Sequence, residues 1–248
     1  MAITEVFSNP AVKTVIFQIR FLNLFFIEKI IGDYQVKIMH YFKDSALILS
    51  KELNILVGPQ NQPLPSIDRP KPANIWQFIT PQQNVRLSVQ TNSLDIVSTS
   101  HKSYAMGEEE KFRDIIQLAL NPFFALVRIP VITRIGLRYI DDCPVIQKNN
   151  TSFSQYYHSA FPLDRFPIDT ADSMDFRVTI RRGDYSLNYR ETLKKVDDKF
   201  VLELDFDGFA LNIKPTKYLS VTDDLHTLIS NEFEATANQS LLEYMRKK

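Results

Sequence analysis

The sequence predicts an α+β protein: a largely antiparallel sheet with helices packed on one face. Several short segments alternate apolar and polar residues, as strands with one buried face do, and turn-forming residues separate them. Other, longer segments place apolar residues at helical spacing. The order of these segments also repeats, because each half of the chain reads strand, helix, several antiparallel strands and helix.

A short motif occurs once in each half. Residues 16–23 (IFQIRFLN) and 134–141 (RIGLRYID) share an identical arginine, Arg20 in the first copy and Arg138 in the second. Successive side chains of an extended chain point to opposite faces, so each arginine lies opposite the apolar residues beside it. We therefore expect two pseudo-repeated halves, residues 1–127 and 128–248. They should pack as one compact unit, because no flexible linker separates them.

In the first half, residues 12–21 have strand character, and helical spacing runs from Asn23 to Phe42. The following strands are expected at 47–53, 75–80, 85–91 and 94–98, joined as an antiparallel meander. Prolines crowd residues 54–74, which predicts a long surface loop or, as the alternative, a docking strip in polyproline II form. Acidic residues at 108–110 suit the start of a helix, which Pro122 should kink or end.

The second half begins with a strand at 132–140. Ser152 and Gln155 have capping-box spacing and predict a short helix through Ala160. Two alternating segments flank Arg182-Gly183-Asp184, a strong hairpin signal. A further strand covers 200–206, and a last helix follows Ser220, with apolar side chains inward as far as Met245.

Composition excludes several classes of protein. The 29 basic and 29 acidic residues balance, so no bulk charge attracts nucleic acid or anionic lipid. No apolar run approaches the roughly 20 residues that span a bilayer. Six scattered glycines exclude P-loop and dinucleotide sites, which need clustered glycines. The single cysteine, Cys143, excludes an intramolecular disulfide and suits a reducing compartment. We expect a cytoplasmic protein with no cofactor and no membrane association.

The segment RIGLRYID at 134–141, with NPAV at 9–12 and IFQIRF at 16–21, resembles a sporadically distributed prokaryotic family of about this length. The strand at Trp76 and the helix at Phe112 are similar too, as is the ending from Leu225 to Phe233. This resemblance covers essentially the whole chain. The family carries no assigned activity, so the resemblance implies a stand-alone protein and supplies no catalytic residues.

Arginines on one strand face are the first candidate site. Arg134 and Arg138 flank Gly136, which would let a ligand come close, and Arg20 occupies the equivalent place in the first motif. Guanidinium groups so arranged could bind a phosphate or carboxylate. The alternative, which we favour, is structural pairing with carboxylates such as those of Asp141, Asp175 and Asp205.

Acidic residues on another strand are the second candidate site. Glu203, Asp205 and Asp207 share one face and could hold Mg²⁺ in a hydrolase acting on a phosphorylated or nucleic-acid substrate. A solvent-facing stripe opposite lysines is the interpretation we prefer, because no strand carries the Glu-x-Lys that such a nuclease needs.

The other polar residues give weaker signals. The four histidines are too far apart in sequence for a zinc site, and no Gly-x-Ser-x-Gly elbow is present. The best argument for nucleic acid is a basic cluster at Arg177, Arg181, Arg182 and Arg190, together with aromatic residues such as Trp76, Tyr104, Tyr139, Tyr156 and Tyr157. We therefore favour a non-catalytic binding or protein-interaction module, acting with a protein partner or as a homo-oligomer, over a metal-dependent hydrolase.

Overall fold

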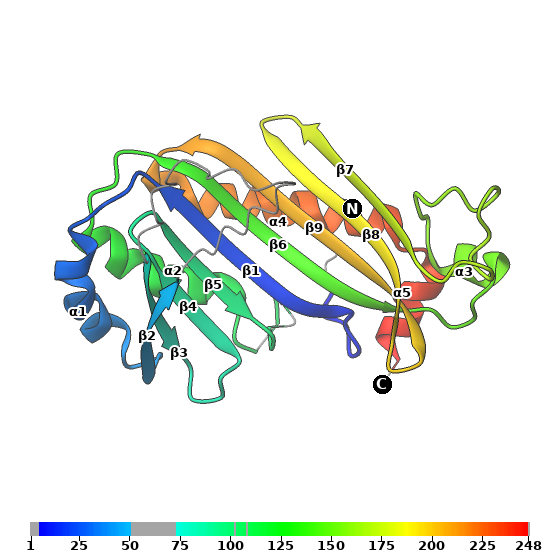
Figure 1. Ribbon diagram of the computed structural model, residues 1–248, viewed down its shortest axis with the longest axis horizontal. Helices are drawn as coiled ribbons and strands as arrows, with labels where there is room; N and C mark the ends of the chain where they lie inside the picture. Colours follow the sequence, from blue (N-terminus) through cyan, green and yellow to red (C-terminus); the bar gives the residue numbers. More distant parts are fainter. Residues whose placement is uncertain (1–4, 51–72, 102, 108, 248) are drawn as a thin grey trace, which may run out of the picture.

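The computed structural model describes residues 5–50, 73–101, 103–107 and 109–247. Within these ranges it contains five α-helices and one antiparallel sheet of nine strands, which confirms the predicted α+β class (Figure 1). The strands are β1 (Val12–Phe21), β2 (Asp44–Ser50), β3 (Ala73–Ile79), β4 (Val85–Val89), β5 (Ser93–Ser98), β6 (Ile132–Pro144), β7 (Met174–Arg182), β8 (Tyr185–Val196) and β9 (Lys199–Ile213). The helices are α1 (Ile27–Ile38), α2 (Phe112–Leu126), α3 (Asn150–Tyr156), α4 (Tyr218–Thr236) and α5 (Gln239–Arg246), and a 3-10 turn at Pro215–Lys217 precedes α4.

The two strands that carry the shared motif lie side by side at the centre of the sheet. The strand order is β2-β3-β4-β5-β1-β6-β9-β8-β7, so β1 pairs with β6 and the other strands of each half lie outward from this pair. The register places Phe17 opposite Leu137 and Arg20 opposite Arg134. The sheet is therefore continuous from residues of the first half to residues of the second.

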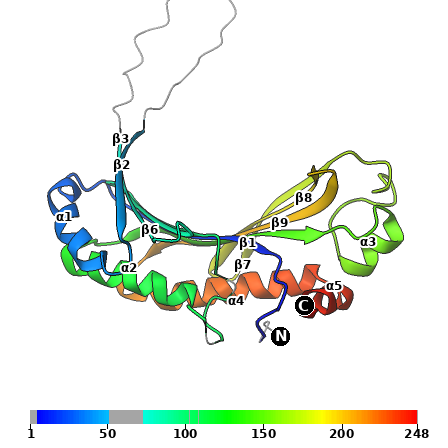
Figure 2. The ribbon, with the colours of Figure 1, turned by 90° about the horizontal axis from the view of Figure 1, so that it is seen from below.

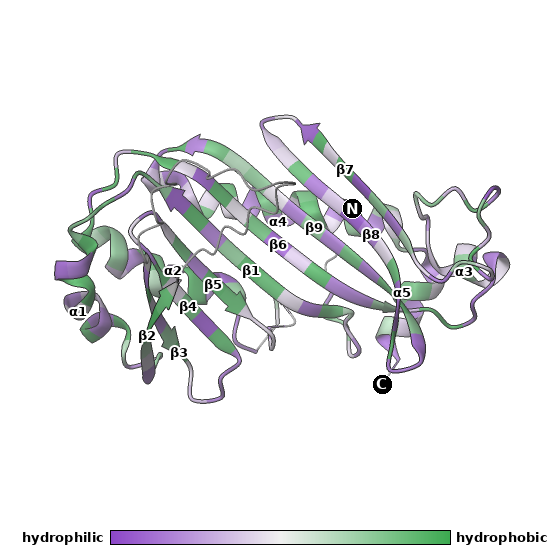
Figure 3. Ribbon diagram, viewed as in Figure 1, coloured by the Kyte–Doolittle hydropathy of each residue, from purple (hydrophilic) through white to green (hydrophobic). Residues whose placement is uncertain are grey.

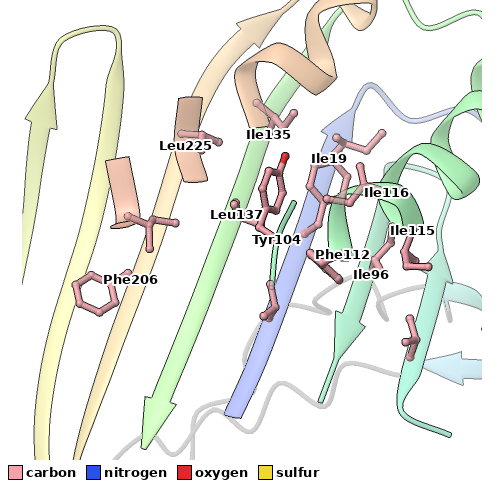
Figure 4. Close-up of a cluster of buried hydrophobic side chains, with 14 of the residues drawn as sticks. Ile19, Ile96, Tyr104, Phe112, Ile115, Ile116, Ile135, Leu137, Phe206 and Leu225 are labelled. Atoms are coloured by element: carbon pink, nitrogen blue, oxygen red, sulfur yellow. The ribbon is translucent and has the colours of Figure 1, made fainter. Parts of the chain in front are cut away.

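Side chains alternate along these central strands between a polar face and an apolar one, visible as stripes in Figure 3. Figure 2 shows α2, α4 and α5 lying along one side of the sheet, with α1 and α3 toward its two ends. Helix α4 packs on β6 and β9, and α1 packs on α2. Figure 4 shows Ile135 and Leu137 of β6 directed into the buried cluster with Ile19 of β1 and Leu225 of α4. The apolar core lies on this side of the sheet.

A tight turn joins β7 and β8 where the sequence predicts it, and a second one joins β8 and β9. The β7–β8 hairpin turns at Gly183, whose φ of +62° lies in the left-handed region that glycine adopts without strain. The β8–β9 hairpin turns at Asp197 and Asp198, both also at positive φ, which aspartate tolerates better than most residues. Most of the predicted loop 54–74 lies outside the described residues; its last two residues begin β3.

The predicted last helix is in fact two helices. Helix α4 ends at Thr236 and α5 begins at Gln239, because the backbone between them pairs with the end of α3. His158 donates its backbone N–H to the Thr236 carbonyl at 2.8 Å, and Asn238 donates to the Tyr156 carbonyl at 2.9 Å. A remote segment thus takes backbone groups that a continuous helix would use itself. Helix α2, which the sequence predicts to kink or end at Pro122, does not end there and continues to Leu126. None of the helices in the described ranges is both long and apolar enough to cross a bilayer.

Candidate functional site

The predicted arginines lie together on the polar face of the sheet, and carboxylates of β9 accompany two of them. Arg134 donates from Nη2 to both oxygens of Asp207, at 2.8 and 2.9 Å. Arg138 binds Asp205 through two nitrogens, at 2.7 and 2.5 Å. Arg20 and Arg134 both donate to the amide oxygen of Gln18, at 2.7 and 3.3 Å. The geometry therefore matches the structural alternative that we favour for Arg134 and Arg138, and Arg20 joins the same network.

Gly136 makes room for a side chain of its own strand. The guanidinium of Arg134 folds over Gly136 toward Asp207, and its central carbon lies 4.8 Å from the centre of the Phe209 ring. A Cβ built on Gly136 would stand 2.5 Å from Arg134 Nη1. Close approach does explain this glycine, but the approaching group is Arg134 and not a ligand.

The acidic stripe on β9 is held by basic and polar side chains. Glu203 forms an ion pair with Lys194 on β8, and Asp207 accepts a further hydrogen bond from Asn188 at 2.9 Å. Asp205 is the partner of Arg138. Among the described residues, no three histidine, cysteine, aspartate or glutamate side chains gather as a metal site would require. Nothing in this arrangement favours the use of the stripe for metal.

The basic cluster on the β7–β8 hairpin is also largely paired with carboxylates. Arg177 and Arg190 both bind Asp175, and Arg182 binds Glu232 on α4. The guanidinium groups are thus not aligned as a free basic surface of the kind that contacts successive phosphates.

A different site lies on the opposite, helix-covered face of the sheet. Alternation along β6 directs Leu137, Tyr139, Asp141 and Cys143 to this face. Beside them, the register of β1 shifts between Val12 and Thr14, and the Asp142 N–H donates to the carbonyl of Ala11 at 2.9 Å. Such bulges redirect a strand end. Here the shift coincides with the point where the chain before β1 leaves the sheet and runs toward the helices (Figure 2).

A pocket forms between this N-terminal segment and α4. Its cavity volume is about 100 Å³, which is below the range usual for drug-sized ligands and suits a molecule with few non-hydrogen atoms. Its walls come from the N-terminal segment 5–12, the loop 103–106, Tyr139 and Asp141 of β6, the 226–233 part of α4, and Met245 of α5. Four separate parts of the chain therefore surround one strand end, and most of the lining is apolar.

Asp141 is the exceptional group in this pocket. Its side chain is only 3% exposed, and its buried Oδ1 has no hydrogen-bond partner. Burial raises the pKa of the Asp141 carboxyl to about 7, and the neighbouring charges of Asp142 and Asp205 act in the same direction. Buried polar atoms in folded proteins are nearly always hydrogen-bonded, so an unpaired one on a residue that lines a pocket indicates a position for a ligand or water.

Aromatic side chains stand beside this carboxyl. The ring of Tyr104 stacks on His226 with centroids 4.3 Å apart, and the Tyr139 hydroxyl lies 3.4 Å from His226 Nδ1. Burial lowers the pKa of His226 to about 4, partly opposed by Asp223, so this imidazole is neutral at physiological pH. The aromatic group therefore presents neutral polar atoms and ring faces to the pocket.

Ionic contacts behind these rings fix their positions. Arg113 of α2 binds Asp223 of α4 through two nitrogens, at 2.8 and 2.9 Å, and the Tyr104 hydroxyl donates to the same carboxylate at 2.8 Å. Burial of Asp223 acts to raise its pKa, but these hydrogen bonds outweigh it and the pKa is lowered. Because Tyr104 is tied to α4 in this way, the wall of the pocket is set before any ligand arrives.

Sequence reasoning placed no site at this pocket. Tyr139 and Tyr104 are predicted as members of a stacking surface, and the structure brings both rings against His226 in the pocket, whereas Trp76 lies on β3 and does not line it. Asp141 is predicted only as a partner for arginines, and it has none. One feature of the sequence could have identified the site. Asp141 follows Leu137 and Tyr139 at every second position of the strand, so its carboxylate lies on the apolar face.

Gly136→Ala tests the explanation of the glycine. The added methyl should displace the Arg134 guanidinium from Asp207, which costs about 1 kcal/mol, the usual size for a partly buried charged hydrogen bond. This cost should cancel the roughly 0.5–1 kcal/mol that alanine otherwise gains over glycine in a strand, so we expect no gain in the free energy of unfolding. The measurement is urea denaturation. Gly32→Ala in α1 is the control; it meets no atom within 4 Å and should raise stability by about 0.5–1 kcal/mol. A Gly136→Ala protein that gains as much stability as Gly32→Ala would contradict the assignment.

Asp141→Asn tests the burial of the carboxyl. The folded-state pKa of about 7 lies above the unfolded value near 3.8, so the unfolded state prefers the charged form and wild-type stability falls as pH rises through this window. The substitution removes that penalty. We expect a gain of up to about 4 kcal/mol near pH 8.5, shrinking below about 1 kcal/mol near pH 4. Comparing variant with wild type at each pH cancels the titration of His226. A gain independent of pH would contradict the prediction.

No protein-family model matches this chain, and no curated protein or solved structure matches it significantly either. Relatives therefore assign no residue role. The pocket beneath β6 is identified by its geometry and by the chemistry of its lining.

Proposed function

We propose that this protein is a non-catalytic binding protein whose ligand is a small, largely apolar molecule held in the pocket beneath β6. The observation that carries the proposal is the buried Asp141 oxygen without a hydrogen-bond partner in an otherwise apolar pocket. A carboxyl in such a place lowers stability unless something pairs with it. Its retention is reasonable if a bound molecule supplies the missing donor.

The surroundings of Asp141 support binding more than catalysis. The nearby hydroxyl of Tyr104 is engaged by Asp223, and the His226 ring is stacked and uncharged. The alternative hydrolase would rely on Glu203, Asp205, Asp207, Arg134 and Arg138, which lie on the other face of the sheet and bind one another or Lys194. No observation favours the hydrolase.

We also infer that the two halves arose by internal duplication of a prokaryotic ancestor and that the helices form a single layer. The symmetric strand order about the β1–β6 pair supports the duplication. So does the order of elements: β1, α1, four strands and α2, then β6, α3, three strands and α4. In this proposal, Asp141 has no counterpart in the first half, because the corresponding position is Asn23, beyond the end of β1.

A second candidate function is binding to a protein partner or to a second copy of the chain. Large apolar side chains are exposed near α1 and on β2; they include Leu22, Phe25, Phe26, Val36, Met39, Leu47 and Leu49. Phe25 is 80% exposed, and clustered apolar exposure is typical of interaction surfaces. We expect self-association that Phe25→Ser together with Met39→Ser abolishes, measured by sedimentation. A wild-type monomer at high concentration would contradict the self-association part.

Ligand binding in the pocket is tested with a neutral aromatic probe, benzyl alcohol. Of the four histidines, only His226 lines the pocket, whereas His40 and His158 are exposed. Titration should therefore shift the ring resonances of His226 in the NMR spectrum and leave those of His40 and His158 in place.

A blocking variant completes this test. Ser230 lines the pocket from α4, and Ser230→Phe should fill the space and remove the shift of His226. Thr227→Phe is the matched control, because Thr227 is exposed on the same helix and the change should leave binding intact. A probe that shifts exposed histidines equally, or still binds Ser230→Phe, would argue against the pocket. Thermal melting confirms that each variant is folded.

A further inference from the structure

We propose that the pocket ligand carries one primary or secondary ammonium group, which donates a hydrogen bond to Asp141, and an apolar body that fills the rest of the space. This inference rests on the proposed function of the pocket and names the chemical class of its ligand. It rests on three features of the pocket lining: its acidic charge, the lack of a hydrogen-bond donor to Asp141, and its aromatic faces.

The charged groups of the lining are acidic. Among the described residues that line the pocket, only Glu5 and Asp141 carry a formal charge, and none is a lysine or arginine. Glu5, at the N-terminal side of the pocket, is neutralised by Arg246 through an ion pair. Asp141 has no such partner, and Asp142 and Asp205 add negative charge behind it. An anionic ligand would meet only repulsion here, whereas a cation would be attracted.

The Asp141 carboxyl lacks a hydrogen-bond donor. A carboxylate oxygen accepts hydrogen bonds, and Oδ1 of Asp141 accepts none from the part of the chain that the structure describes. Tyr139, two residues earlier on the same face, directs its hydroxyl to His226 instead. An ammonium N–H supplies both the donor and the charge, and such charge-assisted hydrogen bonds are about twice as strong as neutral ones. A quaternary ammonium has the charge but lacks the N–H.

The remaining walls suit an ammonium ion on an apolar body. Phe7, Tyr104, Tyr139 and Phe233 contribute aromatic rings, and Met106 and Met245 contribute flexible thioethers. Aromatic faces attract cations through their quadrupole, most strongly where water is excluded. Methionine adapts to ligands of differing shape. The apolar lining thus favours a hydrocarbon or aromatic body over a sugar or nucleotide.

Binding of this kind should depend on pH through Asp141. The carboxyl must be ionised to pair with the cation, and its pKa of about 7 means that ionisation occurs between about pH 6 and pH 8. The charged or titratable groups around it are Asp142 with its partner Lys13, Asp205 with Arg138, the Glu5–Arg246 pair, His226, Tyr104, Tyr139 and Cys143. His226 is already neutral across that range, and the tyrosine pKa values are raised. Affinity should therefore rise about tenfold from pH 6 to pH 8.

The experiment compares matched probes by calorimetry: benzylamine, benzyl alcohol, benzoate and benzyltrimethylammonium. We expect benzylamine to bind at least tenfold more tightly than benzyl alcohol at about pH 8, and benzoate not to bind. Benzyltrimethylammonium should be weaker than benzylamine, because it cannot donate to Asp141. Adding Nα-acetyl-lysine amide and n-butylamine shows whether the pocket accepts the ammonium of a protein side chain or only that of a free amine.

The variants are Asp141→Asn and, as a matched control, Asp142→Asn on the opposite face of the same strand. Asp141→Asn should reduce benzylamine affinity to that of benzyl alcohol, abolish the dependence on pH and leave benzyl alcohol binding unchanged. Asp142→Asn should change benzylamine affinity by no more than about twofold.

The outcomes separate the ligand class from the pocket itself. Benzyl alcohol binding as tightly as benzylamine, or benzylamine binding undiminished to Asp141→Asn, would overturn the ammonium assignment while the pocket stands. If no probe binds and His226 is undisturbed, the Asp141 carboxyl is paired with water only, and the proposed function fails as well.

Discussion

The antiparallel pairing of β1 with β6 at the centre of the sheet is the constraint on which both faces of the molecule depend. In a strand, neighbouring side chains cannot share a face, so β6 sends Arg134, Gly136 and Arg138 to one side and Leu137, Tyr139 and Asp141 to the other. A slip of one residue would bury two guanidinium groups and expose the apolar core. The buried Leu137 opposite the buried Phe17 fixes that register, and the positions of the arginine network and of the pocket follow from it.

The polar face illustrates why arginines in a row need not form a binding site. Three guanidinium groups, those of Arg20, Arg134 and Arg138, share the surface with the carboxylates of Asp95, Asp205 and Asp207. Gln18 connects the arginines with Asp95, because its side-chain oxygen accepts hydrogen bonds from Arg20 and Arg134 and its side-chain nitrogen donates one to Asp95. Charge is balanced locally, and each bidentate contact holds neighbouring strands together. Gly136 belongs to the same network, because a Cβ at this position would force the Arg134 head group to move from its place over the strand.

Asp141 differs from these outward carboxylates in its surroundings. Asp205, Asp207 and Glu203 are each paired with a basic side chain, whereas Asp141 is buried more deeply and has no basic partner. Desolvation without compensation lowers stability, and proteins tend to keep such groups where a ligand compensates. The rigid wall made by Tyr104, Asp223 and Arg113 suits this role, because a preorganised pocket loses little freedom when a ligand binds. In the proposed complex, the cationic group of the ligand compensates for the cost of burying the Asp141 carboxyl.

The sequence by itself determined the α+β class, the approximate positions of most strands and the β7–β8 hairpin, because these depend on local periodicity and on turn-forming residues such as Gly183. The same alternation puts Asp141 in phase with the apolar residues of β6, but from the sequence it is predicted only as a partner for arginines. Tertiary structure decided the rest: which carboxylate meets which arginine, the break between α4 and α5 at Ala237, and the assembly of Glu5, Tyr104, Asp141 and His226 around one pocket. These contacts join residues far apart in the chain, and their partners are selected by packing and strand register, which no local pattern of residues encodes.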